Sequence, residues 1–303
     1  MSDKTEKKVL SSDGIHELSG WVYRPEGTPR GLFHVVHGMT EHIARYDGFM
    51  RDMAAAGYVC FGYDNLGHGH TVREASELGF IAHREGFRYL SEDVARFYAA
   101  LREEYPGLPY YLMGHSMGSF IVRQAAASTV TPDKLVVMGT GGPNPAAGAG
   151  IALIRLIKAT QGERAVSPFL EKMAFGEYNK GFEGTDPYRW LTRDEAVWAR
   201  YAADPLCTFH FTASALEDLV RLNRMVNTKA WFRSMKEKMP ILLVSGSEDP
   251  VGDHGKGVTA VRDGLTAAGA QVQMILYPGA RHEILNDSCR GEVTADICRF
   301  LEK

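Results

Sequence analysis

Short apolar runs alternate with longer amphipathic stretches along most of this chain, and this pattern limits the fold more than any other feature. Runs of strand type occupy residues 31–36, 58–63, 110–113, 135–138, 241–245 and 272–277. Helices are predicted at 46–56, 91–105, from 119 onward and at 292–301. Gly57 follows the end of the first helix, and Ser91 is the predicted N-cap of the second. Since parallel strands need crossover helices, the alternation predicts an α/β fold with a mostly parallel sheet flanked by helices.

The alternation stops between about residues 143 and 239 and then returns. This middle segment is helical in character and holds three of the four tryptophans, Trp190, Trp198 and Trp231. A chain of 303 residues, 45% of them hydrophobic, has enough apolar material for one large core. We therefore predict an α/β core formed by residues 1–142 and 240–303, with residues 143–239 inserted as a helical cap.

Charge and cysteine content argue against several other classes of protein. The net charge is −3, whereas a nucleic-acid binder normally carries a basic stripe, so no nucleic-acid partner is expected. Lys4, Lys7 and Lys8 are interpreted as part of a solvated, partly disordered start of the chain. The four cysteines are scattered without C-x-x-C spacing, which favours reduced and mostly buried thiols over disulfides or a zinc site.

Two sequence features bear on where the protein resides. The first ten residues lack the apolar segment of a secretory signal peptide, so we expect a cytoplasmic protein. Residues 135–154 carry no charge, but Pro143, Asn144 and Pro145 would break a helix in the middle of this stretch. It is therefore interpreted as a strand, a loop and the start of a helix rather than as a membrane span.

The segment GHSMG at residues 114–118 stands between a strand-type run and an apolar helical run. In this context G-x-S-x-G matches a nucleophile elbow, a sharp turn that exposes a serine hydroxyl at the end of a sheet. Small residues two positions before and after the serine allow the turn to close. Ser116 is therefore the predicted nucleophile.

A serine hydroxyl needs a base to remove its proton, and in this type of fold the acid and the histidine follow the serine in that order. The loop after the penultimate strand offers Asp249, with Glu248 and Asp253 as competitors. The loop after the last strand contains His282, the only histidine beyond that strand. Order and position together predict a triad of Ser116, His282 and Asp249.

Two backbone N–H groups are predicted to bind the oxygen that becomes negative during the reaction. Met117 follows the serine at a helix N-terminus, and Met39 follows the first clear strand. His37, two residues earlier, is predicted to be structural. His68 and His70 lack nearby ligands of suitable spacing, so no metal is expected.

Several motifs together resemble the monoacylglycerol lipase and lysophospholipase branch of the α/β-hydrolases: HGMTEH (37–42), RY (45–46), DNLGHG (64–69), YPGLP (105–109), GHSMG (114–118), GSEDPV (246–251) and RHEILND (281–287). The resemblance runs from about Val9 to Phe300 and is weak in the cap segment. It implies an α/β-hydrolase fold, cleavage of carboxylic esters without metal or organic cofactor, and the site residues Ser116, Asp249, His282, Met39 and Met117. One departure is Ser119, where the branch commonly has a second glycine.

The expected substrate is a small-molecule ester, an acyl lipid of the monoacylglycerol or lysophospholipid type. A short-chain carboxylesterase, a thioesterase or an amidase would use the same triad, and a non-catalytic ligand-binding protein is the alternative outside enzymes. Arg155 and Lys158, beside isoleucines, would suit transient contact of the cap with a membrane surface. Apolar cap residues are expected to line an acyl site or to pack the cap itself: Ile151, Ile154, Leu156, Ile157, Phe169, Met173, Phe175, Phe182, Phe209, Phe211 and Met225.

Overall fold

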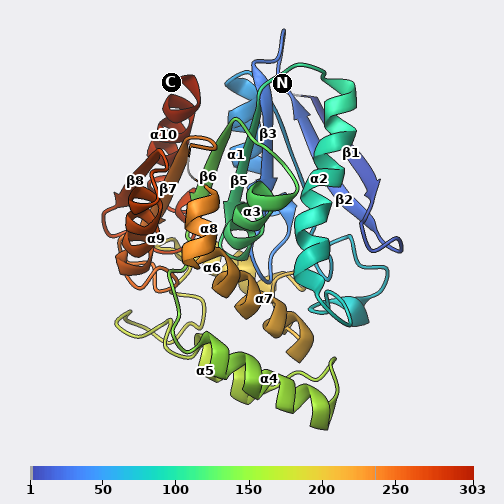
Figure 1. Ribbon diagram of the computed structural model, residues 1–303, viewed down its shortest axis with the longest axis vertical. Helices are drawn as coiled ribbons and strands as arrows, with labels where there is room; N and C mark the ends of the chain where they lie inside the picture. Colours follow the sequence, from blue (N-terminus) through green and yellow to red (C-terminus); the bar gives the residue numbers. More distant parts are fainter. Residues whose placement is uncertain (1–2, 236) are drawn as a thin grey trace.

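An eight-stranded sheet in the order β1-β2-β4-β3-β5-β6-β7-β8 forms the centre of the computed structural model, which describes residues 3–235 and 237–303 (Figure 1). β1 and β2 are antiparallel to each other, and β2 is antiparallel to β4. All the other neighbours run parallel. The strands are β1 (Asp3–Leu10), β2 (Glu17–Arg24), β3 (Gly31–Val36), β4 (Tyr58–Tyr63), β5 (Tyr110–His115), β6 (Lys134–Met138), β7 (Ile241–Gly246) and β8 (Val272–Tyr277). The predicted mostly parallel α/β sheet is confirmed.

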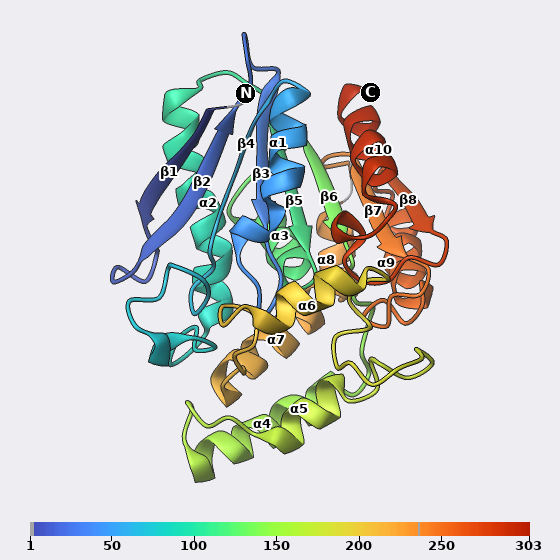
Figure 2. The same ribbon diagram turned by 180° about the vertical axis from the view of Figure 1, so that it is seen from behind.

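Helices cover both faces of the sheet, with α1 and α10 on the face shown in Figure 2 and α2, α3, α8 and α9 on the other. Leu112 and Met113 are neighbours on β5 but belong to different apolar clusters, one on each face. This double burial explains why the central strands are continuous apolar runs in the sequence. The helices are α1 (Asp47–Ala55), α2 (Gly86–Glu104), α3 (Met117–Ser128), α8 (Lys229–Ser234), α9 (Lys256–Ala267) and α10 (Arg290–Glu302).

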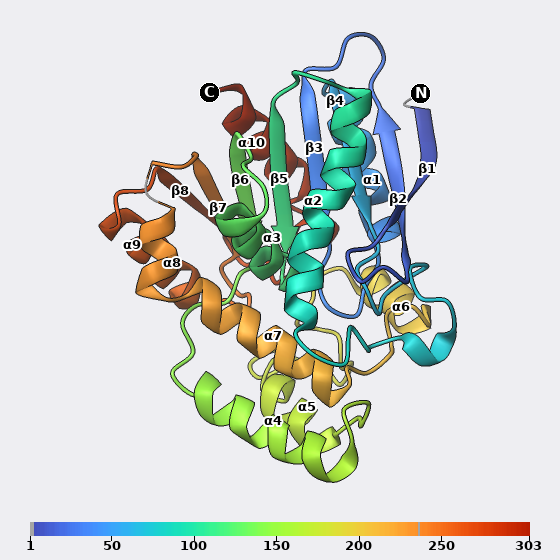
Figure 3. The ribbon, with the colours of Figure 1, turned by 45° about the vertical axis from the view of Figure 1, so that its right-hand side comes forward.

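Four helices of the segment between β6 and β7 lie beyond the carboxyl ends of the parallel strands (Figure 3). They are α4 (Ala147–Gln161), α5 (Pro168–Phe175), α6 (Glu195–Ala203) and α7 (Ala213–Val226). α8 returns to the core, where Phe232 packs against Gly264 of α9. The boundaries of the cap at 143 and 239 stay a prediction, and we keep the name cap for this segment.

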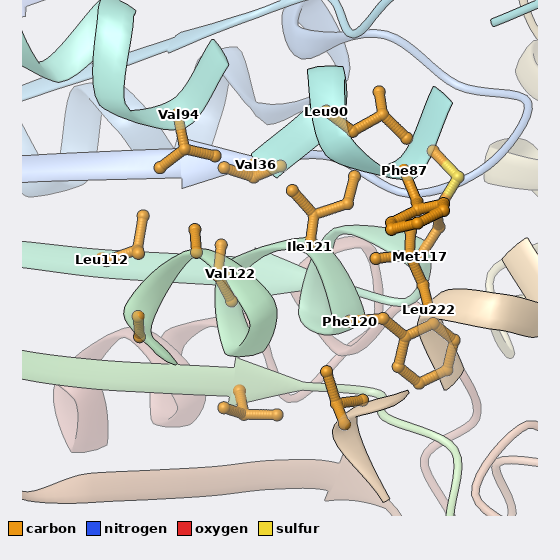
Figure 4. Packing of buried hydrophobic residues seen from close by; sticks show 14 of the residues in the cluster. Val36, Phe87, Leu90, Val94, Leu112, Met117, Phe120, Ile121, Val122 and Leu222 are labelled. Atoms are coloured by element: carbon orange, nitrogen blue, oxygen red, sulfur yellow. The ribbon is translucent and has the colours of Figure 1, made fainter. Parts of the chain in front are cut away.

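The helix that follows Ser116 is held by packing on the sheet and on α2 (Figure 4). Ile121 and Val122 of α3 are fully buried in the same cluster as Leu112 of β5 and Val94 of α2. Burying one such side chain contributes about 1.5–3 kcal/mol, so this layer fixes the position of α3.

The predicted disorder at the N-terminus is wrong for the described residues, because residues 3–10 form edge strand β1. Lys4 pairs with Asp47 at 2.7 Å, and Lys7 pairs with Glu104 at 2.5 Å. Both faces of this edge strand carry charged residues, so it lacks the apolar alternation by which strands are recognised in sequences.

The predicted start of α2 at Ser91 is also wrong, because the helix begins at Gly86. Ser91 lies inside the helix and its hydroxyl donates to the Phe87 carbonyl. The first residue of the helix instead lies against Asp218 on α7, which is far away in the sequence: a Cβ on Gly86 would lie 2.5 Å from Oδ2 of Asp218. Local sequence carries no signal for a helix start that is stabilised by a distant element.

The uncharged stretch 135–154 divides into β6, a loop and the start of α4, as predicted. No helix among the described residues is long and apolar enough to cross a membrane. The four cysteines are free, as predicted, but only Cys60 and Cys207 are buried, while Cys289 and Cys298 are half-buried.

The contact between Asp218 and α2 makes stability depend on pH. Asp218 is 2% exposed, its Oδ2 has no hydrogen-bond partner, and burial raises the pKa of its carboxyl to about 7. A folded-state pKa above the ordinary 3.8 means that this group lowers stability as pH rises from about 4 to about 7. We predict that the stability of Asp218→Asn relative to wild type increases by about 1–3 kcal/mol between pH 5 and pH 8.

Urea unfolding at both pH values measures this effect. Asp263→Asn is the control, because Asp263 lies exposed on α9 with 61% of its side chain accessible. A stability difference between Asp218→Asn and wild type that is the same at both pH values would contradict the prediction.

Candidate active site

Ser116 stands in the sharp turn between β5 and α3, with φ 53° and ψ −120°. A positive φ is strained for a residue other than glycine, so the surrounding structure has to hold it. A Cβ on Gly114 would overlap the Gly118 carbonyl, and one on Gly118 would overlap the carbonyl oxygen of Val36. The Ser116 N–H donates to the Met138 carbonyl at 3.0 Å and ties the turn to the end of β6. Both glycines are therefore required where the sequence has them.

Ser119, the departure from the family pattern, fits into the turn through hydrogen bonds. Its side chain is fully buried. The Ser119 hydroxyl lies 2.5 Å from the carbonyl oxygen of Ser116 and 2.9 Å from the Thr140 hydroxyl. A serine therefore replaces glycine here with its polar atom satisfied.

Asp249 and His282 form a buried pair at the carboxyl ends of β7 and β8. Nδ1 of His282 lies 3.0 Å from each carboxylate oxygen of Asp249, and the two residues are 2% and 0% exposed. The carboxylate also accepts hydrogen bonds from the Ser245 hydroxyl at 3.1 Å and the Val251 N–H at 2.9 Å. The imidazole is thereby held in one orientation, with Nε2 away from Asp249.

Electrostatics keep Asp249 ionised in spite of its burial. Burial alone would raise the pKa of this carboxyl, but the charge and hydrogen bond of His282 and the Val251 N–H lower it below 3.8. The competitors do not reach His282: Glu248 is half exposed and 3.9 Å from His254, and Asp253 is exposed. The structure therefore brings Asp249, of the three acids considered, to His282.

The strand ends bring Ser116 and His282 to the same region. Gly139 follows the residue whose carbonyl accepts the Ser116 N–H, and a Cβ on Gly139 would lie 3.1 Å from Cε1 of His282. Within residues 3–235 and 237–303, however, no hydrogen bond joins the Ser116 hydroxyl to His282.

The loop after β3 approaches the serine from the other side. A Cβ on Gly38 would lie 3.0 Å from Cβ of Ser116, so this loop passes close to the turn. Met39 follows, and Thr40 beyond it has φ 49°. The hydroxyl of Tyr201, on α6, donates to the Thr40 carbonyl at 2.7 Å, so the cap holds the loop next to Met39.

His37 is structural, as predicted. It is fully buried, its Nδ1 lies 2.8 Å from the Gly38 carbonyl oxygen, and its Nε2 accepts the Asn65 N–H at 2.9 Å. Burial lowers the pKa of His37 to about 4, so the ring is neutral at physiological pH.

Two features near His282 were not found from the sequence. The Trp190 ring of the cap packs on His282 with centroids 5.1 Å apart, and the Trp190 carbonyl accepts the His282 N–H at 3.4 Å. Glu41 and His115 form part of a buried polar network behind the serine. Glu41 and His115 belong to motifs that carry the family resemblance, but the spacing of these motifs does not show that the two side chains meet.

Metal-ligating atoms gather at one place in the described part of the chain, at His42, Asp204 and Cys207, within 4.8 Å of one another. Nε2 of His42 lies 2.9 Å from Oδ2 of Asp204, which is an ordinary hydrogen-bond length. Cys207 is 1% exposed and packs with Leu191 and Tyr201. Hydrogen bonding and apolar packing account for these positions, so we assign no metal chemistry to them.

A model of the family described as serine aminopeptidase, S33, matches residues 27–289, most of the chain. The chain belongs to this family. It is 27% identical to a monoacylglycerol lipase of Mycolicibacterium smegmatis, over 99% of this chain and 98% of that protein.

Solved structures agree with this family membership. A thermostable carboxyl esterase from Bacillus coagulans, in complex with glycerol, matches with a TM-score of 0.93 and 30% identity, covering 99% of this chain and 98% of that one. A lipase in its open form matches with a TM-score of 0.89 and 28% identity over the same shares. This member of the S33 family therefore has the α/β-hydrolase fold, and its predicted place in the monoacylglycerol lipase-like branch is confirmed.

The crowding around Gly118 leads to a testable prediction. A methyl group at this position would overlap the backbone of β3, so Gly118→Ala should destabilise the protein by more than about 2 kcal/mol and abolish hydrolysis. Gly150→Ala is the matched control, because Gly150 lies in α4 with nothing within 4 Å of an added Cβ. That change should stabilise the helix by about 0.5–1 kcal/mol.

Urea unfolding of both variants measures the two effects. A Gly118→Ala variant with wild-type stability would show that the turn tolerates a side chain there.

Proposed function

We propose that this protein is a serine esterase that hydrolyses carboxylic esters of lipid-like substrates, of the monoacylglycerol or lysophospholipid type. Ser116 is the nucleophile, His282 is the general base, and Asp249 orients the histidine. The observation that carries the proposal is the buried Asp249–His282 pair, with 3.0 Å contacts, at the same sheet edge as the strained Ser116 turn.

In the proposed cycle, Oγ of Ser116 attacks the ester carbonyl while Nε2 of His282 takes the hydroxyl proton. Asp249 fixes the tautomer of His282 and stabilises the imidazolium that forms. The backbone N–H groups of Met39 and Met117 donate to the oxyanion. His282 then protonates the leaving alcohol, and a water molecule activated by the same histidine releases the acid from Ser116.

A lipid-like substrate is supported by relatives described as monoacylglycerol or monoglyceride lipases. The apolar cap residues range from buried through half-buried to exposed. Ile151, Ile154 and Phe211 are at most 6% exposed and pack inside the protein. Leu156 and Phe169 are each 61% exposed. These two exposed side chains are therefore open to the outside rather than part of the core.

Transient contact of the cap with a lipid surface is part of the same proposal. Arg155 and Lys158 are engaged within the protein, because each donates to Glu217 of α7 at 2.9 Å. The exposed Leu156 and Phe169 lie on α4 and α5, the helices farthest from the sheet (Figure 3). Apolar side chains in that position suit insertion into a membrane interface.

Other acyl substrates would use the same residues. A short-chain ester, a thioester or an amide needs no different triad, and the aminopeptidase description of the family gives some support to an amide. A non-catalytic ligand-binding protein would be expected to lack a triad residue, whereas Ser116, His282 and Asp249 are all present.

The nucleophile is tested by substitution. We predict that Ser116→Ala abolishes ester hydrolysis and fluorophosphonate labelling, because no other group supplies the nucleophile. Asp249→Asn should lower kcat by about 10³–10⁴-fold, since it leaves the histidine without its charged partner. Ser128→Ala, on the exposed end of α3, is the control and should behave as wild type.

The substrate class is tested with p-nitrophenyl esters whose acyl chains range from about 2 to 16 carbons. A rate that peaks at about 8 carbons or more is expected for a lipid esterase. Activity confined to the shortest esters would indicate a short-chain carboxylesterase. Turnover of amides alone would contradict the ester proposal.

Lipid contact is tested with phosphatidylcholine vesicles. We predict that the double variant Leu156→Ser, Phe169→Ser binds vesicles at least about fivefold more weakly than wild type, while hydrolysis of a soluble short ester is unchanged. Ile15→Ser is the matched control, since Ile15 is 60% exposed but lies in the turn between β1 and β2. Equal losses in the double variant and in the control would contradict a role of the cap.

A further inference from the structure

One buried carboxylate outside the proposed triad contacts the loop that holds Met39. Glu41 lies two residues beyond Met39 and is 3% exposed. Its Oε1 accepts hydrogen bonds from the Gly38 N–H at 2.6 Å and the Tyr46 hydroxyl at 2.9 Å. Its Oε2 accepts from Nη1 of Arg45 at 3.0 Å. A carboxylate with this many donors around it is strongly held in place.

Glu41 is ionised. Burial alone would raise the pKa of its carboxyl, but the hydrogen bond and charge of His115 and the charge of Arg45 hold it well below its ordinary value. A buried charge of this kind is stable only while its partners stay in position, so it also fixes those partners.

The first connection runs from Glu41 to the proposed oxyanion donor. Gly38 directly precedes Met39, so its hydrogen bond to Glu41 orients the backbone that presents the Met39 N–H. The same glycine lies between the carboxylate and the nucleophile. A Cβ on Gly38 would lie 2.7 Å from Oε1 of Glu41 and 3.0 Å from Cβ of Ser116.

The second connection runs through His115, the residue before Ser116. Nδ1 of His115 lies 3.2 Å from Oε1 of Glu41, and its Nε2 lies 3.2 Å from the carbonyl oxygen of His282. A carbonyl oxygen only accepts hydrogen bonds, so Nε2 of His115 carries a hydrogen. The rings of His115 and His282 also pack with centroids 4.6 Å apart.

The third connection runs through Arg45 to the residue after His282. Arg45 donates to both carboxylate oxygens of Glu283, at 2.6 and 2.7 Å, while its Nη1 also reaches Glu41. Through His115 and Arg45, Glu41 is therefore linked to the His282 carbonyl and to the side chain of the next residue, although the two loops are far apart in the sequence.

We propose that Glu41 is a positioning residue that holds the Met39 N–H and His282 in register with Ser116. Glu41 acts through Gly38, His115 and Arg45. The proposal rests on the triad and oxyanion donors proposed above. Charge develops on the oxyanion and on the imidazole only in the transition state, so a misplaced loop lowers kcat more than it raises KM.

Glu41→Gln tests this with almost no change in size. One of the two carboxylate oxygens becomes an amide NH₂ group, which cannot accept a hydrogen bond. The bond from either Gly38 or Arg45 is therefore lost. We expect kcat on p-nitrophenyl octanoate to fall about 10–100-fold, with KM within about threefold of wild type. Tyr46→Phe removes one hydrogen bond to the carboxylate and keeps the charge, so kcat should fall about 3–10-fold.

The matched control is Glu77→Gln. Glu77 is 7% exposed and pairs with Arg73 and His16, outside the site. Its substitution should leave kcat unchanged. Thermal unfolding shows which variants are folded at the assay temperature.

A folded Glu41→Gln variant with kcat within about twofold of wild type would overturn the proposal. If Glu41→Gln does not fold, the Tyr46→Phe variant tests the proposal in its place. An unchanged kcat in Tyr46→Phe would then overturn the proposal. An equal loss of kcat in Glu77→Gln would indicate general destabilisation and overturn it as well. Failure of the proposed triad would give a different result from failure of the Glu41 proposal. Ser116→Ala would then remain active, whatever the effect of Glu41→Gln.

Discussion

The strained turn at Ser116 is the constraint on which the rest of the site depends. A residue with φ 53° and a side chain persists only where its surroundings hold it. Here the Ser116 N–H is bound to Met138 on β6, Gly118 passes against the backbone of β3, and α3 is buried on the sheet. The turn is therefore stabilised by strands on both sides of it, so it needs a parallel sheet already in place.

The parallel sheet also explains how distant residues come to share one site. The loops after β3, β5, β7 and β8 leave the sheet at the same edge, because the carboxyl ends of parallel strands lie together. Asp249 and His282 meet there although 33 residues separate them, and Arg45 meets Glu283 across 238 residues. Asp249 and Glu283 each have a cationic or hydrogen-bonding partner, which is the condition for keeping a carboxylate charged away from water.

Hydrophobic periodicity predicted the central strands well, but it missed edge strand β1 and the start of α2. The apolar runs at 31–36 and 58–63 coincide with β3 and β4, because strands buried on both faces leave a continuous signal. β1 has charged residues on both faces and gives no such signal. The start of α2 lies against Asp218 of α7, which no window of local sequence contains. The weakly matched cap likewise could not be resolved into its helices from the sequence.

The sequence by itself determined the class of fold and the identity of the candidate catalytic groups. Strand period, the glycines of the GHSMG turn and the order of Ser116, Asp249 and His282 are local or ordinal properties, and these can be read along a chain. Only the tertiary structure decided that Asp249 rather than Glu248 or Asp253 meets His282. It also decided that Glu41 links three loops and that Trp190 covers the histidine. The physical reason is that hydrogen bonds and burial depend on distance in space, and distance along the sequence does not fix that.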